Sequence, residues 1–100
     1  MVKHYIIWKM NEGLTEEQKA KAKLDIKTAL EGLVGKIDGL EKMEIKTECF
    51  EASAGDIMMD SEFSSKEALE AYQVNPLHVD VATNIVRPNV EIRLSFDYEE

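Results

Sequence analysis

Tyr72 and His78 are the two residues whose types and spacing fit a reaction most readily, and they flank the pair Asn75-Pro76. A helix N-terminus disfavours positive charge, so an imidazole there can stay neutral and accept a proton. A tyrosine hydroxyl can donate a hydrogen bond to a developing oxyanion. As catalytic candidates, Tyr72 and His78 therefore predict acid–base chemistry that needs no cofactor.

A small ligand is the second chemical possibility that the sequence presents. The first residues alternate in a way that places a histidine among apolar side chains on one strand face, and a later strand adds a matching apolar face. Fixed polar groups in an apolar cavity are typical of small-molecule sites. The expected ligand-binding residues are His4, Ile6, Trp8, Ile57 and Met59.

Each of these side chains also has a purely structural interpretation. Tyr72 and Trp8 can pack in a core, and His78 can hydrogen-bond the backbone at a helix junction. His4 can be a buried polar residue whose ring is satisfied by a partner. A single hydrogen-bond network joining them would stabilise the fold without any catalysis.

The elements that must position these residues form one domain over residues 1–100. Alternating patterns predict strands at 2–10, 41–50, 57–63 and 90–96. Helix-start signals predict a long helix after Thr15, a second after Ser64, and a short third one after Asn75 that runs to about Val86. This order predicts an α+β, ferredoxin-like split βαβ fold, with a four-stranded antiparallel sheet and helices on one face.

The pattern also assigns the two faces of that sheet. In the last strand, Val90, Ile92, Leu94 and Phe96 are expected to meet the helices, and Cys49 is expected to be buried in the second strand. Oppositely charged residues then interleave on the other face. That face fits either a solvated surface or a polar interface between two sheets. Its charged members would include Lys3, Lys42, Glu44, Asp60, Glu62, Glu91, Arg93 and Asp97.

Composition excludes several classes of function. The net charge of −8 argues against a nucleic-acid or anionic-membrane surface, because phosphate binding needs clustered Lys and Arg. A single cysteine allows no intrachain disulfide and no cysteine-based zinc cluster. The histidines and carboxylates show no metal-ligand spacing, so we expect neither a metal nor a cofactor. The first residues lack the apolar run of a signal peptide, and a cytoplasmic location is expected.

Several short stretches together resemble the stress-responsive α/β-barrel (Dabb) family. They are the opening Val2–Lys9, the capping box at Thr15, the turn at Ile37–Leu40, the segment Phe63–His78, and the ending at Phe96–Tyr98. Asp38 and Asn75 depart from the family pattern, which has proline in the turn and histidine before Pro76. The second departure puts in doubt any chemistry that needs an imidazole at position 75.

The resemblance implies a homodimer whose two sheets face each other to form a closed dimeric α/β barrel with a polar interior. A plant polyketide cyclase of this family uses a tyrosine and a histidine at the positions of Tyr72 and His78. A small barrel of this kind that carries a tryptophan such as Trp8 also resembles cofactor-free monooxygenases of the same architecture. Three hypotheses follow: a stress-responsive protein that binds a small organic molecule between sheet and helices, a stress-associated structural protein with no ligand, and a cofactor-free acid–base enzyme.

Overall fold

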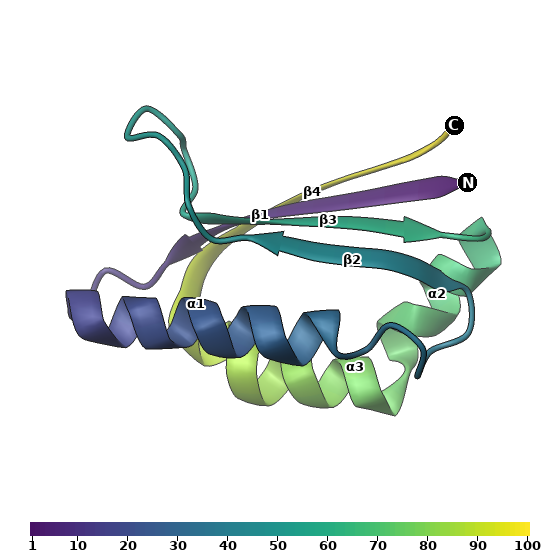
Figure 1. The fold of residues 1–100 in the computed structure, drawn as a ribbon, viewed down its shortest axis with the longest axis horizontal. Coiled ribbons are helices and arrows are strands. Elements are labelled where there is room, and N and C mark those ends of the chain that lie inside the picture. The colour runs from purple at the N-terminus through teal and green to yellow at the C-terminus, as the bar shows by residue number, and fades with distance from the viewer.

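In the computed structural model, which describes residues 1–100, helices cover one face of a four-stranded antiparallel sheet (Figure 1). The strands lie in the order β2-β3-β1-β4, so the predicted ferredoxin-like α+β fold is confirmed. No helix is both long enough and apolar enough to span a lipid bilayer. The elements are β1 (Val2–Met10), α1 (Glu16–Glu31), β2 (Leu40–Lys46), β3 (Ile57–Phe63), α2 (Lys66–Val74), α3 (Pro76–Val81) and β4 (Val90–Glu99).

Side-chain caps begin the first two helices. The Thr15 hydroxyl accepts a hydrogen bond from the Gln18 amide, and the Gln18 side chain accepts one from the Thr15 amide, as the predicted capping box requires. Helix α2 begins one residue later than predicted. Its cap is Ser65, whose hydroxyl accepts from the Ala68 amide, and not Ser64.

Asn75 and Pro76 form the junction between α2 and α3. The Asn75 side chain accepts from the Leu77 amide at 2.9 Å, and Pro76 occupies the first turn of α3. This predicted junction sets where α3 begins and so sets the position of His78 in α3. Beyond α3 the chain does not stay α-helical to Val86, because residues Ala82–Val86 form a π-helical turn and residues Arg87–Asn89 form a 3₁₀ turn.

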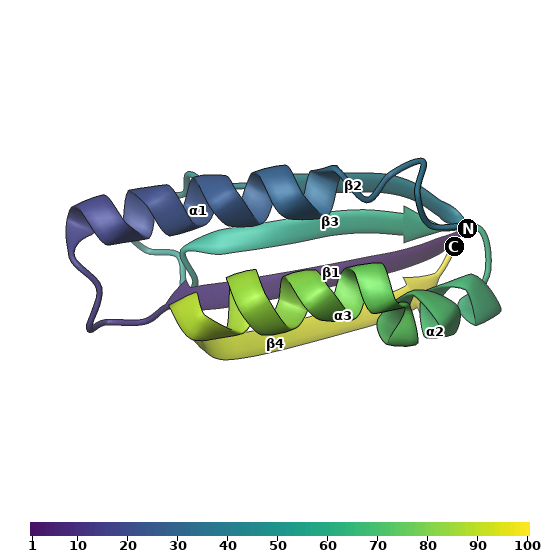
Figure 2. The same cartoon turned by 90° about the horizontal axis from the view of Figure 1, so that it is seen from below.

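The core fills the space between the sheet and α1, and Figure 2 shows α1 and α3 lying side by side across that face. Every second side chain of β1 is buried there, from Val2 through Ile6 and Trp8 to Met10. The inward faces of β2 and β3 match their predicted alternation. From α1, Ala22, Ile26 and Leu30 complete the contact.

The connection between β2 and β3 is longer than the sequence pattern indicated. Strand β2 ends at Lys46, and the chain then projects from the sheet on the side away from the helices (Figure 1). Cys49 is therefore exposed outside the strand, and the prediction that it is buried in β2 was wrong. Phe50 is 88% exposed in the same loop. Alternation persists in the sequence beyond Lys46, but no neighbouring strand pairs with it.

The inward face of β4 was also predicted wrongly. Val90 lies opposite Met10, but Ile92 lies opposite Lys9, so Glu91 is an extra residue in a β-bulge. An inserted residue reverses the two faces of the strand beyond it. Arg93 therefore pairs with Trp8 on the helix side, and Asp97 pairs there with His4. The opposite face of β4 carries Ile92, Leu94, Phe96 and Tyr98.

The open face of the sheet consequently has an apolar half and a charged half. In the charged half, Lys42 pairs with Asp60 at 3.0 Å and Lys3 pairs with Glu62 at 3.1 Å. In the apolar half, the rings of Tyr5 and Tyr98 stack with their centroids 6.2 Å apart. Leu94 is 58% exposed on this half. The sequence pattern had instead predicted that the charged residues Arg93 and Asp97 would lie on this face. A contiguous exposed apolar patch of this kind marks an interaction surface.

Candidate functional site

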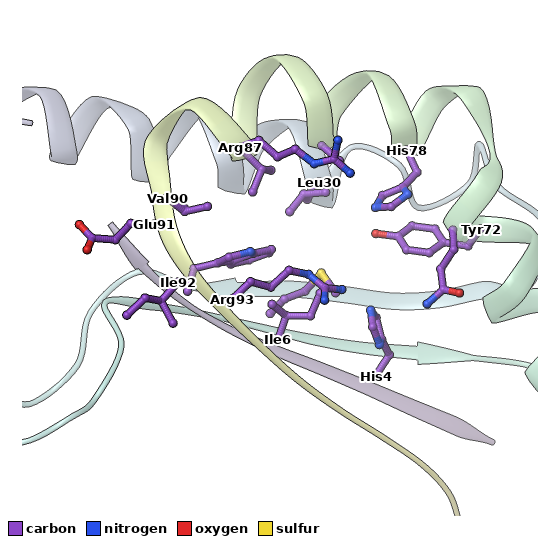
Figure 3. Close-up of a pocket in the computed structure, with 15 residues that line it drawn as sticks. His4, Ile6, Leu30, Tyr72, His78, Arg87, Val90, Glu91, Ile92 and Arg93 are labelled. Carbon is purple, nitrogen blue, oxygen red and sulfur yellow. The ribbon is translucent and has the colours of Figure 1, made fainter. Parts of the chain in front are cut away.

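A pocket of about 520 Å³ lies between the sheet and the segment that runs from α2 through α3 to β4 (Figure 3). This volume falls within the range of roughly 300–1,000 Å³ that is usual for small-molecule sites. Tyr72 and His78 line one end, and His4 rises toward them from β1. The apolar wall of the pocket includes Ile6, Trp8, Leu30, Met59 and Val86.

Tyr72 and His78 are held ring against ring. Their centroids are 4.0 Å apart with an angle of 31° between the planes, and the ring centroids of Phe63 and Tyr72 are 4.9 Å apart. Tyr72 is only 1% exposed. Nevertheless the Tyr72 hydroxyl and the His78 Nδ1 have no hydrogen-bond partner in the protein. Unpaired buried polar atoms are uncommon, and at a pocket they are groups that a ligand can satisfy.

The surroundings of the two rings set their protonation states. Burial raises the pKa of the Tyr72 hydroxyl far above its ordinary value, so this group remains a donor at physiological pH. Burial lowers the pKa of His78 below 6.5; the Gln73 backbone is the strongest opposing influence, and the nearby His4 and Arg93 add smaller contributions that lower this pKa further. His78 is therefore a neutral imidazole near pH 7.

His4 is fixed by the strands on both sides of it. Its Nδ1 contacts the Asp97 carboxylate, which β4 places directly opposite. On the other side, the buried Ser61 hydroxyl donates to the His4 carbonyl at 2.7 Å. The ring is 1% exposed, as expected for a buried polar residue with a partner. Because Asp97 contacts Nδ1, Nε2 is the one ring nitrogen of His4 that has no partner in the protein.

The structure gathers six of the seven residues that the sequence nominated. His4, Ile6, Trp8, Met59, Tyr72 and His78 all line the pocket. Ile57 does not, because it packs in the core opposite Trp8 on the neighbouring strand. The structure groups no three His, Cys, Asp or Glu side chains that could hold a metal ion.

The pocket also contains Arg87 and Arg93, which the sequence pattern did not predict to lie there. Arg93 had been assigned to the open face, since strict alternation along β4 does not anticipate the bulge at Glu91. Arg87 directly follows Val86, where the third helix was predicted to end, and no pattern marked it for a site. The available signal was composition: these are the only two arginines in the chain.

The fold and the pocket together define a ferredoxin-like α+β protein with a cavity between sheet and helices. Residues 2–100 match the Stress responsive A/B Barrel Domain, Dabb. The chain therefore belongs to the Dabb family, as its short motifs indicated. No curated protein matches the chain.

Solved structures agree with this assignment. A dimeric protein of unknown function with a ferredoxin-like fold from Bacteroides fragilis is 29% identical, with a TM-score of 0.90 over 99% of this chain and 95% of its own. A Dabb family protein from Mesorhizobium loti is 19% identical, with a TM-score of 0.76 over 99% and 95%. A hydroxynitrile lyase from Passiflora edulis is 16% identical, with a TM-score of 0.70 over 97% and 90%. At such low identity, the last two show the fold alone.

Tyr72→Phe tests whether the tyrosine hydroxyl is kept for the pocket or for stability. Because the hydroxyl has no protein partner, we expect its removal to leave the free energy of unfolding unchanged or to raise it by about 1 kcal/mol. Ser61→Ala is the matched control, since it also removes a buried hydroxyl but breaks a hydrogen bond to His4. That variant should lose about 1 kcal/mol. Urea unfolding measures both, and an equal loss in the two variants would contradict a pocket role for the Tyr72 hydroxyl.

Proposed function

We propose that this Dabb protein acts as a homodimer that binds a small organic molecule in the pocket between sheet and helices. The observation that carries the proposal is the pair of buried, unpartnered atoms at the pocket, the Tyr72 hydroxyl and the His78 Nδ1. Leaving such atoms unpaired costs on the order of 1–3 kcal/mol each. A ligand with complementary polar groups recovers that free energy, while its apolar body contacts the wall around Trp8.

A thermal-shift screen of metabolites on the wild-type protein tests this proposal. A ligand present at about 100 times its Kd stabilises the folded state by roughly 2.7 kcal/mol, which raises Tm measurably. The variant Ala82→Phe adds a ring to a residue that lines the pocket and should abolish the shift. Ala71→Phe makes the same change at an exposed position of α2 away from the pocket and should retain it. If no metabolite raises Tm, the structural role without a ligand is favoured.

The open face of the sheet supports the proposed homodimer. Leu94, Phe96 and Tyr98 are exposed there together with Ile7 of β1, on the side opposite the helices. Burying apolar side chains is the main driving force for association. The similar proteins from Bacteroides fragilis and Thermobifida fusca are both described as dimeric. A second copy of the sheet is thus the partner best suited to this face, and its association leaves the pocket on the other face accessible.

Leu94→Glu should convert the dimer to a monomer, because it places a charge within the apolar half of the open face. Leu24→Glu is the matched control: Leu24 is 62% exposed against 58% for Leu94, but it lies on α1. Light scattering should give a dimeric mass for wild type and for Leu24→Glu, and a monomeric mass for Leu94→Glu. A monomeric wild type, or equal effects of the two substitutions, would contradict the proposed interface.

A cofactor-free acid–base enzyme is the second candidate. It is favoured by the packing of the neutral His78 ring against the ring of Tyr72, whose hydroxyl stays protonated. His78→Gln should then abolish turnover of a compound found in the screen while its binding persists.

A base must be neutral to act, and burial lowers the pKa of His78 below 6.5. Turnover by the wild type should therefore be constant above about pH 7 and decline only below 6.5. Binding without any turnover would leave the ligand-binding function alone.

A further inference from the structure

The two arginines concentrate positive charge in a protein that is otherwise strongly acidic. The chain has a net charge of −8, yet Arg87 and Arg93 both line the same pocket. Figure 3 shows Arg93 reaching across the pocket from β4 toward the Tyr72 end, while Arg87 enters from the helix side. Neither guanidinium forms an ion pair within 4.0 Å or a side-chain hydrogen bond in the protein. Both donor groups are free to bind a ligand.

No carboxylate of the pocket neutralises these guanidiniums. Glu91 is the only acidic residue that lines it, and its side chain points away from the cavity (Figure 3). The Glu91 Oε1 is held by the Glu12 amide at 2.7 Å. Asp97, the nearest acid on the helix side of β4, is occupied by His4. The charge that the pocket presents to a ligand is therefore positive.

The remaining lining determines what kind of anion fits. Ile6, Trp8 and Leu30 form an apolar wall, which suits a hydrocarbon body and disfavours a ligand that carries charge along its whole length. At the far end, the protonated Tyr72 hydroxyl offers one more donor. A guanidinium recognises a carboxylate through two parallel hydrogen bonds, and a tyrosine donor can add a third.

We propose that the ligand is a small organic carboxylate. Its anionic head binds Arg93 and the Tyr72 hydroxyl, Arg87 supplies further positive charge from the helix side, and its apolar body lies on Ile6 and Trp8. This inference rests on the proposed ligand-binding function and specifies the chemical class of that ligand.

Matched acids and amides test the charge requirement. Thermal shift and calorimetry on the wild-type protein should show binding of phenylacetate and hexanoate, with phenylacetamide and hexanamide at least about 10-fold weaker, as expected when a hydrogen bond to a charged group is lost. Equal binding of acid and amide would overturn the proposal. Tighter binding of phenylphosphonate than of phenylacetate would also overturn it, in favour of a phosphate-type head.

Three single substitutions locate the charge. Arg93→Gln should weaken phenylacetate binding roughly 10- to 100-fold, and Arg93→Lys should recover part of it because the charge remains without the planar fork. Lys36→Gln is the control for loss of one positive charge, since Lys36 is exposed and lies outside the pocket. It should change binding by less than about 2-fold, because water and salt screen an exposed charge outside the pocket. An Arg93→Gln effect no larger than that of Lys36→Gln would overturn the assignment.

The metabolite screen separates failure of this inference from failure of the proposed function. One outcome is that neutral compounds raise Tm, that Ala82→Phe abolishes this shift, and that no carboxylate binds. In that case the ligand class is wrong and the binding function stands. If no small molecule binds at all, both are wrong.

Discussion

The pairing of β4 with β1 determines which β4 side chains reach the pocket. Across most of its length the register is regular, but Val90 faces Met10 while Ile92 faces Lys9. One extra residue, Glu91, therefore reverses the strand from that point onward. Without the bulge, Arg93 would lie on the open face and Leu94 among the helices. With it, a basic pocket and an apolar exposed face are built from the same strand.

The pocket depends on this register in a second way. Asp97 can hold His4 only because the two residues face each other on the helix side of the sheet. With His4 fixed, the rings of Phe63, Tyr72 and His78 pack in succession beside it. The Tyr72 hydroxyl thus lies in a rigid aromatic setting without a protein partner. Such preorganisation lowers the entropy that ligand binding would otherwise cost.

Most of the fold and part of the site could be predicted from local sequence. The inward faces of β1, β2 and β3 follow simple alternation, and Thr15 and Asn75 cap helices through side-chain chemistry that is visible in the sequence. The failures share a physical cause. Arg93 was misplaced and Cys49 was taken to be buried because alternation records local pattern only, whereas a bulge and the end of a strand depend on pairing with a neighbour. Ile57 was nominated for the site because periodicity gives the face of a side chain and not its depth in the core.

The two faces of β4 also connect the proposed dimer with the proposed ligand site. β4 is an edge strand that pairs with β1 alone, and in a single protomer nearly all of its side chains are exposed. Strands with few buried contacts open more readily than central ones. A second sheet covering Leu94 and Phe96 would bury one face of β4 and so stabilise its pairing with β1. Arg93 and Asp97 lie on the same strand, and their positions at the pocket would be stabilised by that contact. Dimer formation on one face would thereby order the ligand site on the other.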